Sequence, residues 1–428
     1  MAEVHGDGGY RMLAELLEAS HLATLENVPA LVARHAARVG LRDPVIYLAD
    51  LCQDMLVELT AAGTEGDRRH QPVDSSLPGR AYGHVEIVVR EPGTHGTPGT
   101  PGTPKMPGAP GRGQGSGPPA AHRVWLPLLD GTERLGVLGA TVPEWGPVAR
   151  EHLRALASLV ALMIVSKRPH SDTYARLVRS RPMTLPAEVI RPLLPPLTVA
   201  TPDLVVCAQL EPAYEVGGDI VDLALSGSVA HVSVFDAMGH DQSSGLITAI
   251  ATGTCRNERR QGTGLVATSE AIDRAVGMQF GRRRFVTGVL ADLDRRTGEL
   301  HWVNRGHPPP LLIRGGRRLI RLDRPPAPPM GFQLDAEPRQ WTYQLEPGDR
   351  LLLYTDGVVE ARDEHGRPFG LNRFVDLTLR RQSDGLPVPE TLRRLMRSLL
   401  DHHGGRLQDD ATVMLVEWQG DEARRLLV

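Results

Sequence analysis

The first part of the chain carries two kinds of hydrophobic pattern. Apolar residues recur at helical spacing over residues 10–39 and again over residues 147–167. Between them lie two pairs of short apolar runs, one joined by polar residues at 50–54 and the other by Asp-Gly at 130–131. Apolar runs joined in this way are typical of β-hairpins. The order helix, hairpin, hairpin, helix therefore predicts a small α+β domain with an antiparallel sheet over residues 1–165.

The second part, residues 197–420, consists mostly of short strand-like apolar runs separated by turns. Helical spacing interrupts these runs at residues 245–280 and again after Pro389. A Pro-Gly-Asp turn at 347–349 lies between two apolar runs and predicts a further hairpin. Many antiparallel strands with few helices favour a β-sandwich flanked by helices, so the fold class of the whole chain is expected to be α+β.

Two segments fit neither pattern. Residues 91–121 repeat the triplet Gly-Thr-Pro and almost lack large apolar residues, so we predict a disordered insert within the first domain. Residues 166–196 mix helical stretches with prolines, and we predict that they form a helical connector. The connector would join the domain at residues 1–165 to the domain at residues 197–420.

Composition narrows the class of protein. The chain has 428 residues, of which 41% are hydrophobic, and this is enough for two or three domains. A net charge of −3 argues against a nucleic-acid partner. No apolar run is long enough to span a membrane, and the first residues do not resemble a signal peptide. Since Cys52, Cys207 and Cys255 are far apart and lack metal-ligand spacing, we expect a protein of the reducing cytoplasm.

The candidate chemistry lies in acidic residues at the ends of strand-like runs in the second domain. Asp236 ends the run VSVF, Asp356 follows LLLYT, and Asp409 comes just before ATVMLV. Two unit charges 4 Å apart cost about 4 kcal/mol at an effective dielectric constant of 20, so carboxylates that converge need a cation. Hard divalent cations prefer such oxygen ligands. If these three side chains meet, metal ions are the expected reason.

A fourth acid, Asp219, follows Gly217 and Gly218, which allow a tight approach of the backbone. Asp222 lies three residues further on, so in a regular strand its side chain faces the opposite side, and Asp219 is favoured. The alternative interpretation is structural, because Asp and Gly are ordinary turn residues. Each motif taken singly more often marks only a turn. Their occurrence in order, each beside a strong strand, favours a site.

Other polar residues of the second domain are expected to have structural roles. His307 precedes a run of prolines and is expected to cap a turn. The arginines at 282–284 could attract a phosphorylated partner, but the expectation is that they lie in a solvated loop. Asp410 would point away from Asp409 in a strand, so it is kept only as a secondary candidate.

The acidic motifs also resemble those of a known family. The resemblance lies in five blocks: EVGGDIVD, FDAMGHD, VTGVLADLDRRTGELHWVNRGHPPPLL, LLLYTDGVVEARDEHGRPFG and DDATVMLV. Together they are similar to the PPM metal-dependent serine/threonine protein phosphatases, in particular the bacterial branch typified by sporulation protein E (SpoIIE). The resemblance covers residues 185–418 and implies an α-β-β-α sandwich with two Mn²⁺ or Mg²⁺ ions at one end.

Family resemblance also assigns roles to residues. Asp236 would bridge both ions with the backbone carbonyl of Ala237 as a further ligand, Asp356 and Asp409 would hold one ion, and Asp219 would support the other. Secondary candidates are Asp222, Gly357 and Asp410.

The implied activity is hydrolysis of phosphoserine or phosphothreonine by a hydroxide held between the two ions, without a side-chain nucleophile. The implied substrate is a phosphorylated anti-anti-sigma factor or a similar small regulator. Two residues depart from the family pattern, Val221 in place of an aromatic residue and Asp241 in place of glycine. The alternative is therefore a pseudophosphatase, which binds a partner without turnover under the control of the N-terminal domain.

The first domain resembles a GAF sensor domain through the blocks VIYLADL, SLPGRAYG and VWLPLLDGTERLGVLG. This resemblance implies an unknown small-molecule or protein signal that is passed on through residues 174–195. A purely dimerising domain and a nucleotide-binding regulator are the alternatives, and a homodimer is left open.

Overall fold

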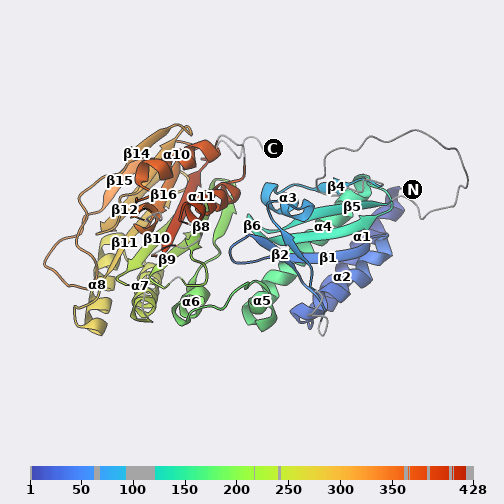
Figure 1. The fold of residues 1–428 in the computed structure, drawn as a ribbon, viewed down its shortest axis with the longest axis horizontal. Coiled ribbons are helices and arrows are strands. Elements are labelled where there is room, and N and C mark those ends of the chain that lie inside the picture. Colours follow the sequence, from blue (N-terminus) through green and yellow to red (C-terminus); the bar gives the residue numbers. More distant parts are fainter. Residues whose placement is uncertain are drawn as a thin grey trace, which may run out of the picture. The chain divides into compact units, whose positions relative to one another are not determined.

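The computed structural model describes residues 2–61, 68–92, 121–215, 217–239, 242–360, 365, 367–382, 386–403, 407 and 409–420. Most of the insert expected at 91–121 lies outside the described residues, as does Asp241. The chain divides into two compact units (Figure 1). The N-terminal unit comprises Met1–Asp130 and Arg134–Ser180, and the C-terminal unit includes Arg181–Val428.

A six-stranded sheet forms the centre of the N-terminal unit, with strand order β3-β2-β1-β6-β5-β4. Both predicted hairpins are present, since β1 pairs antiparallel with β2 and β5 lies beside β6. The strands are β1 (Arg42–Ala49), β2 (Met55–Glu58), β3 (His70–Pro72), β4 (Val88–Arg90), β5 (His122–Asp130) and β6 (Glu133–Val142).

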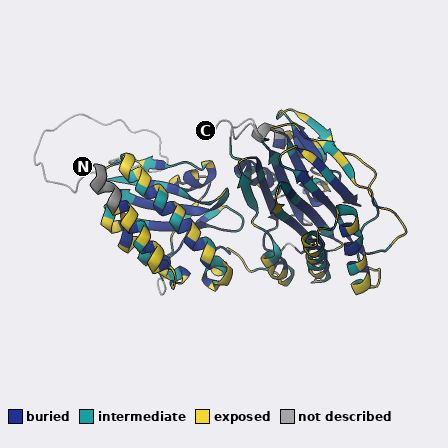
Figure 2. Cartoon of the chain, turned by 180° about the vertical axis from the view of Figure 1, so that it is seen from behind, coloured by how far each residue is buried: buried dark blue, intermediate teal, exposed yellow. Residues whose placement is uncertain are grey.

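Helices cover both faces of this sheet. Apolar residues of α1, α2 and α4 form one core with one face of the sheet, whereas α3 packs Ala81 and Tyr82 against Val45 and Tyr47 on the other. Figure 2 shows the buried strands beneath helices whose outer sides are exposed. The helices of this unit are α1 (Ala2–Ser20), α2 (Val28–Ala36), α3 (Leu77–His84), α4 (Pro147–Lys167) and α5 (Asp172–Leu177).

The helical pattern expected at residues 10–39 is confirmed, with a break in the middle. The structure has two α-helices there, separated by a turn and the short 3₁₀ helix Leu25–Asn27. Helix α2 runs into a 3₁₀ turn, Ala37–Val39, that ends at Gly40 with φ of 77°, a left-handed conformation that favours glycine. The sequence analysis did not predict β3, α3 or β4, because these elements are too short to show a clear period.

Two antiparallel sheets form the C-terminal unit. Their strand orders are β15-β12-β11-β10-β9 and β14-β13-β16-β17-β8-β7. The strands of the five-stranded sheet are β9 (Asp219–Ser226), β10 (Val229–Ala237), β11 (Val286–Asp294), β12 (Glu299–Arg305) and β15 (Trp341–Gln344). Those of the six-stranded sheet are β7 (Thr198–Thr201), β8 (Leu204–Glu211), β13 (Leu311–Arg314), β14 (Arg318–Arg321), β16 (Arg350–Tyr354) and β17 (Ala411–Trp418).

The predicted flanked sandwich is confirmed by three apolar layers. Between the sheets, Trp302 of one packs in a common core with Met414 of the other. Helices α7 and α8 pack on the five-stranded sheet around Phe235, and α10 and α11 pack on the six-stranded sheet around Leu415. The order of layers is therefore α-β-β-α. The helices are α6 (Leu185–Ile190), α7 (Gln242–Arg260), α8 (Leu265–Phe280), α9 (Gly357–Glu360), α10 (Leu371–Gln382) and α11 (Val388–His402).

The hairpin expected around residues 347–349 is wrong. Strand β15 pairs with β12 in one sheet, whereas β16 pairs with β13 and β17 in the other. The chain crosses between the sheets because Leu345 and Leu351, on either side of the turn, both point into the core that the two sheets share. Two apolar runs around a turn predict that the strands are close, but not that they pair.

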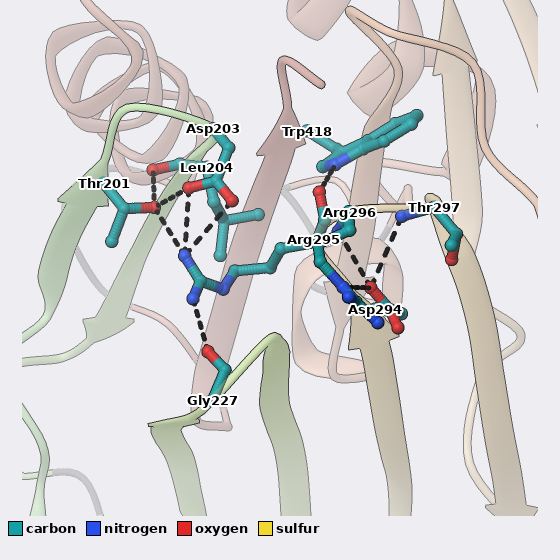
Figure 3. A network of polar contacts seen from close by, with 9 residues as sticks. All are labelled: Thr201, Asp203, Leu204, Gly227, Asp294, Arg295, Arg296, Thr297 and Trp418. Atoms are coloured by element: carbon teal, nitrogen blue, oxygen red, sulfur yellow. Dashed lines mark hydrogen bonds and ion pairs between the residues drawn. The ribbon is translucent and has the colours of Figure 1, made fainter. Parts of the chain in front are cut away.

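The end of the sandwich where β9 leads into β10 is closed by an arginine (Figure 3). Arg295 donates from Nη1 to both carboxylate oxygens of Asp203 at 2.9 and 3.2 Å and from Nη2 to the carbonyl of Gly227 at 2.6 Å. The indole of Trp418 donates to the Arg295 carbonyl at 2.7 Å. The acid at this end of the sheets thus has a cationic partner.

Candidate functional site

The opposite end of the sandwich gathers five acids from both sheets. Asp219 begins β9 and lies directly across the antiparallel ladder from Asp236, near the end of β10. Asp356 follows β16, and Asp409 and Asp410 precede its antiparallel neighbour β17. Since antiparallel neighbours begin and end at a common edge, each sheet brings its acids to this end.

Asp410 joins the two sheets. Its Oδ2 atom accepts hydrogen bonds from the backbone amides of Gly217, Gly218 and Asp219 at 2.8, 2.7 and 3.3 Å. These amides lead into β9, whereas Asp410 leads into β17. Hydrogen bonds from backbone amides to a carboxylate are among the stronger ones in proteins, so this contact fixes the turn before β9.

Thr355 makes a second link. Its buried hydroxyl donates to Oδ2 of Asp219 at 2.7 Å and accepts from the backbone amide of Thr412 at 2.9 Å. One side chain of β16's end therefore contacts both β9 and β17. The bond occupies one oxygen of Asp219 and orients its carboxylate.

Glycines make the close packing at this end feasible. A Cβ atom on Gly218 would lie 3.1 Å from the carbonyl oxygens of both Ala237 and Gly239, and one on Gly357 would lie 2.0 Å from the carbonyl oxygen of Asp410. Thr248 of α7 holds the Gly218 carbonyl with a hydrogen bond of 2.8 Å. The tight approach expected at the glycines before Asp219 is confirmed.

Burial and mutual repulsion raise the pKa of these carboxyl groups. Burial, followed by the charges of Asp356, Asp409 and Asp410, raises the pKa of Asp236 to about 8. The pKa of Asp219 is raised well above its usual range by burial and then by Asp236 and Asp410. Among the described residues, no cation acts on Asp236 to oppose the rise. The cluster therefore favours a bound positive charge or protons.

The same physical causes raise the pKa of the other two buried acids, with partial compensation. For Asp356 they are burial and then the charges of Glu360 and Asp409, opposed by the backbone amide of Gly357. For Asp410 burial is again the largest cause, opposed by the three amides that it accepts from. Asp409 is exposed, and its Oδ1 accepts from the amide of Asp410 at 2.9 Å.

Asp222 does not belong to the cluster. Its side chain lies on the other face of β9, where Arg256 and Arg259 of α7 form ion pairs with it at 2.8 and 2.6 Å. This separation from Asp219 follows from the alternation of strand side chains. Val221 is also not part of the cluster, because it lies in the core between the two sheets, where it contributes apolar contacts.

The remaining candidates have the following places. His307 is buried, its ring nitrogen Nδ1 lies 2.8 Å from the Thr287 hydroxyl, and burial lowers its pKa to about 4, so it is a neutral turn residue as expected. Arg284 is half-buried, and its Nη1 lies 3.6 Å from the place that a Cβ would take on Gly239. Arg284 thus approaches the loop after Asp236, which the solvated loop predicted for 282–284 did not foresee.

The donor set suits a hard divalent cation, because it consists of carboxylates with the Ala237 carbonyl nearby. As they stand, however, the side chains described do not include three or more His, Cys, Asp or Glu residues grouped so that they could hold a metal ion. The chemistry of the residues fits the ion, although the described carboxylates are not arranged to hold it.

Sequence reasoning missed Thr355 and gave Asp410 too small a part. A threonine between an apolar run and Asp356 was a usable signal, since a buried hydroxyl needs a partner. The partners of Asp410 lie more than 190 positions earlier in the chain, and no local pattern indicates them.

The C-terminal unit has a recognisable domain. Residues 226–419 match the family model of stage II sporulation protein E (SpoIIE). The match spans less than half of the chain and includes Asp236, Asp356, Asp409 and Asp410. Asp219 lies seven positions before the start of the match.

Curated relatives match only part of this chain. Phosphoserine phosphatase RsbP of Bacillus subtilis (strain 168) is 30% identical over 135 residues, which cover 30% of this chain and 33% of RsbP. Phosphoserine phosphatase RsbU of the same organism is 20% identical over 208 residues, 48% of this chain and 60% of RsbU. The chain therefore spans less than two thirds of the length of either relative.

Among solved structures, the RsbU and RsbW domains of Rv1364c from Mycobacterium tuberculosis superpose with a TM-score of 0.46 at 25% identity. The superposition covers 51% of this chain and 62% of that chain. None of the helices in the described ranges combines the length and apolar character that crossing a membrane requires.

Proposed function

We propose that the C-terminal unit is a metal-dependent phosphatase that hydrolyses phosphoserine or phosphothreonine in proteins. The observation that carries the proposal is the gathering of acids from four strand ends, where no cation among the described residues acts on Asp236. Burial and then the neighbouring carboxylates raise the pKa of Asp236 to about 8. The match to the SpoIIE family and the similarity to two phosphoserine phosphatases support the class of reaction.

The cofactor in this proposal is a pair of Mn²⁺ or Mg²⁺ ions. Asp219, Asp236, Asp356, Asp409 and the carbonyl of Ala237 would hold them. When bound, such ions neutralise phosphoryl oxygens and lower the pKa of a water that attacks phosphorus.

The chain's own residues would prepare this site by orientation. Asp410 holds the amides before Asp219, and Thr355 donates to one oxygen of Asp219 and so orients its carboxylate. Burial of Asp219 and Asp410 excludes water from them and strengthens their interaction with any cation. Arg284, near Gly239, would attract the phosphoryl group of the substrate.

The finer parts of the proposal concern biology. A phosphorylated anti-anti-sigma factor or similar regulator is the proposed substrate, and the N-terminal unit is proposed to act as a GAF-like sensor, with a homodimer left open. A cytoplasmic location agrees with three free cysteines, Cys52, Cys207 and Cys255.

One observation favours the second candidate, a pseudophosphatase that binds without turnover. The described acids do not stand ready as a group of three that could hold a metal ion. In that case the chain would recognise a partner through the same end of the sandwich while its hydrolysis rate stayed at background.

The test uses the full chain stripped with EDTA and then titrated with MnCl₂, with p-nitrophenyl phosphate and a phosphoserine peptide as substrates. We expect Mn²⁺-dependent release of phosphate from both, lost in Asp236→Asn but retained in Asp335→Asn, an exposed acid outside the cluster. Mn²⁺ binding by calorimetry without any turnover would favour the pseudophosphatase. Absence of both binding and turnover would refute the metal site itself.

A further inference from the structure

A second polar site lies in the N-terminal unit. A cavity of about 600 Å³ opens on its sheet, a volume within the usual range of sites for small organic ligands. Three guanidinium groups and two aromatic rings contribute to its wall, and no residue of α3 does. The lining side chains on which the argument depends are Asp43, Tyr47, Arg69, Arg90, Arg123 and Trp125.

Strand alternation places these side chains on one face. Arg123 and Trp125 are alternate residues of β5, and Arg90 stands two residues after Val88 on β4. Val88 belongs with Tyr47 to the apolar cluster that α3 covers. The cavity is thus the polar continuation of that covered face.

The guanidinium of Arg123 donates hydrogen bonds only to neutral groups among the residues that the structure describes. It donates from Nη1 to the carbonyl of Asp43 at 2.7 Å and to the hydroxyl of Thr141 at 3.0 Å, and it lies 4.7 Å above the Trp125 ring. Burial lowers the pKa of the guanidinium; Asp43 opposes that shift, and Arg69 adds to it. A half-buried cation without an ion pair is costly, and an anion would relieve the cost.

The backbone of β1 is irregular next to Arg123. The pairing of β1 with β6 shifts register between Arg42 and Val45, and Asp43 has φ of 46°, a left-handed conformation uncommon for residues other than glycine. This bulge frees the Asp43 carbonyl from the ladder, and that carbonyl accepts from Arg123. Bulges of this kind re-aim groups beside functional sites.

The other two arginines differ from each other. Arg69 is neutralised by Glu58, which accepts two hydrogen bonds from it at 2.7 and 2.9 Å. Arg90 is exposed, and among the residues that the structure describes it has no ion-pair partner. Against these charges the wall offers one carboxylate, that of Asp43, so positive charge is in excess.

We propose that this cavity binds a small organic anion, whose carboxylate or phosphate oxygens accept hydrogen bonds from Arg123 and Arg90 beside the ring of Trp125. Guanidinium groups bind such oxyanions with paired, charge-assisted hydrogen bonds. The inference does not depend on the activity of the C-terminal unit.

Isothermal titration of the full chain tests the proposal in buffer with EDTA, so that no divalent ion can bring anions to the acidic cluster. The probes are benzoate and inorganic phosphate, with benzamide as the neutral counterpart of benzoate. We expect benzoate or phosphate to bind, and benzamide to bind about tenfold more weakly than benzoate or not at all. Trp125→Phe should remove any change in tryptophan fluorescence that binding causes.

Two substitutions locate the binding. Arg90→Gln should weaken anion binding about tenfold without a cost in folding, because Arg90 has no ion-pair partner among the described residues. Arg154→Gln is the matched control, an exposed arginine of α4 on the other side of the sheet, and should bind as the unaltered chain does. If neither anion binds, or if Arg90→Gln binds the anion with unchanged affinity, the assignment is overturned.

Discussion

Buried acids in the C-terminal unit differ in what neutralises them. Asp222 forms ion pairs with two arginines of α7. The buried acids Asp349 and Glu390 form ion pairs with Arg314 and Arg393, respectively. The acids at the ends of β9, β10, β16 and β17 have each other as neighbours instead.

An arginine-rich chain can evidently supply a partner for a buried carboxylate. Among the described residues, the lack of a cationic partner is therefore a property of this cluster and not of buried acids in this fold generally. Paired acids contribute to a stable sandwich, whereas unpaired acids raise the free energy of the folded state until something positive arrives. A substitution of a paired acid should therefore mainly lower stability, whereas a substitution in the unpaired cluster should mainly lower activity.

The largest effect is expected for Asp356→Asn. Removing this carboxylate should lower phosphatase activity on p-nitrophenyl phosphate by on the order of 10³-fold, since a ligand of the reacting ions is lost. Stability in EDTA should stay the same or rise, because repulsion with Asp409 is relieved. Steady-state assays and urea unfolding measure both. Equal activity in Asp356→Asn and in the surface control Asp335→Asn would contradict the assignment.

Asp222→Asn is expected to lower stability and to leave activity nearly unchanged. It leaves Arg256 and Arg259 without their buried partner and should cost about 3 kcal/mol in the free energy of unfolding. Activity per folded molecule should change little, because Asp222 lies on the far face of β9. The measurement is urea unfolding alongside Asp356→Asn, and similar stability losses in the two variants would remove the contrast.

The cluster should also make stability depend on pH when no metal is bound. Because the folded-state pKa of Asp236 is raised to about 8 from 3.8, the folded state holds its proton more tightly. The associated stability is complete below about pH 4 and is lost as the pH rises toward 8, by on the order of 2 kcal/mol. Urea unfolding in EDTA at several pH values, for the unaltered chain and Asp236→Asn, isolates this part as a difference. A difference that does not vary with pH would count against a raised pKa.

The smallest effect is expected at Thr355, a neutral side chain that contacts the acidic cluster. Thr355→Val removes the hydroxyl that orients Asp219 and should cost about 1–2 kcal/mol of stability. Activity should fall roughly tenfold, as is common for groups that orient a metal ligand. Thr355→Ser keeps the hydroxyl and should restore most of the activity, whereas a serine variant as poor as valine would argue for a packing role alone.

Local sequence patterns were sufficient for much of this arrangement. Asp236 and Asp356 each follow a strong apolar run, so their location at strand ends was predictable, and the choice of Asp219 over Asp222 followed from strand alternation. The metal roles of these residues remain predictions.

Long-range features were not predictable in this way. The crossing at 347–349 failed as a hairpin because periodicity indicates burial but not which strand becomes the neighbour. The contact of Asp410 with Gly217 and Gly218 depends on two sheets meeting, and a single local window cannot contain both.

That contact of Asp410 has a mechanical consequence. A single carboxylate oxygen sets how far apart the two sheets stand at the acidic end, since three consecutive amides from the opposite sheet converge on it. A shorter side chain at position 410, or longer hydrogen bonds from the three amides, would widen or distort the acidic end of the sandwich. Asp410 thus controls the geometry of the site although it need not contact a substrate.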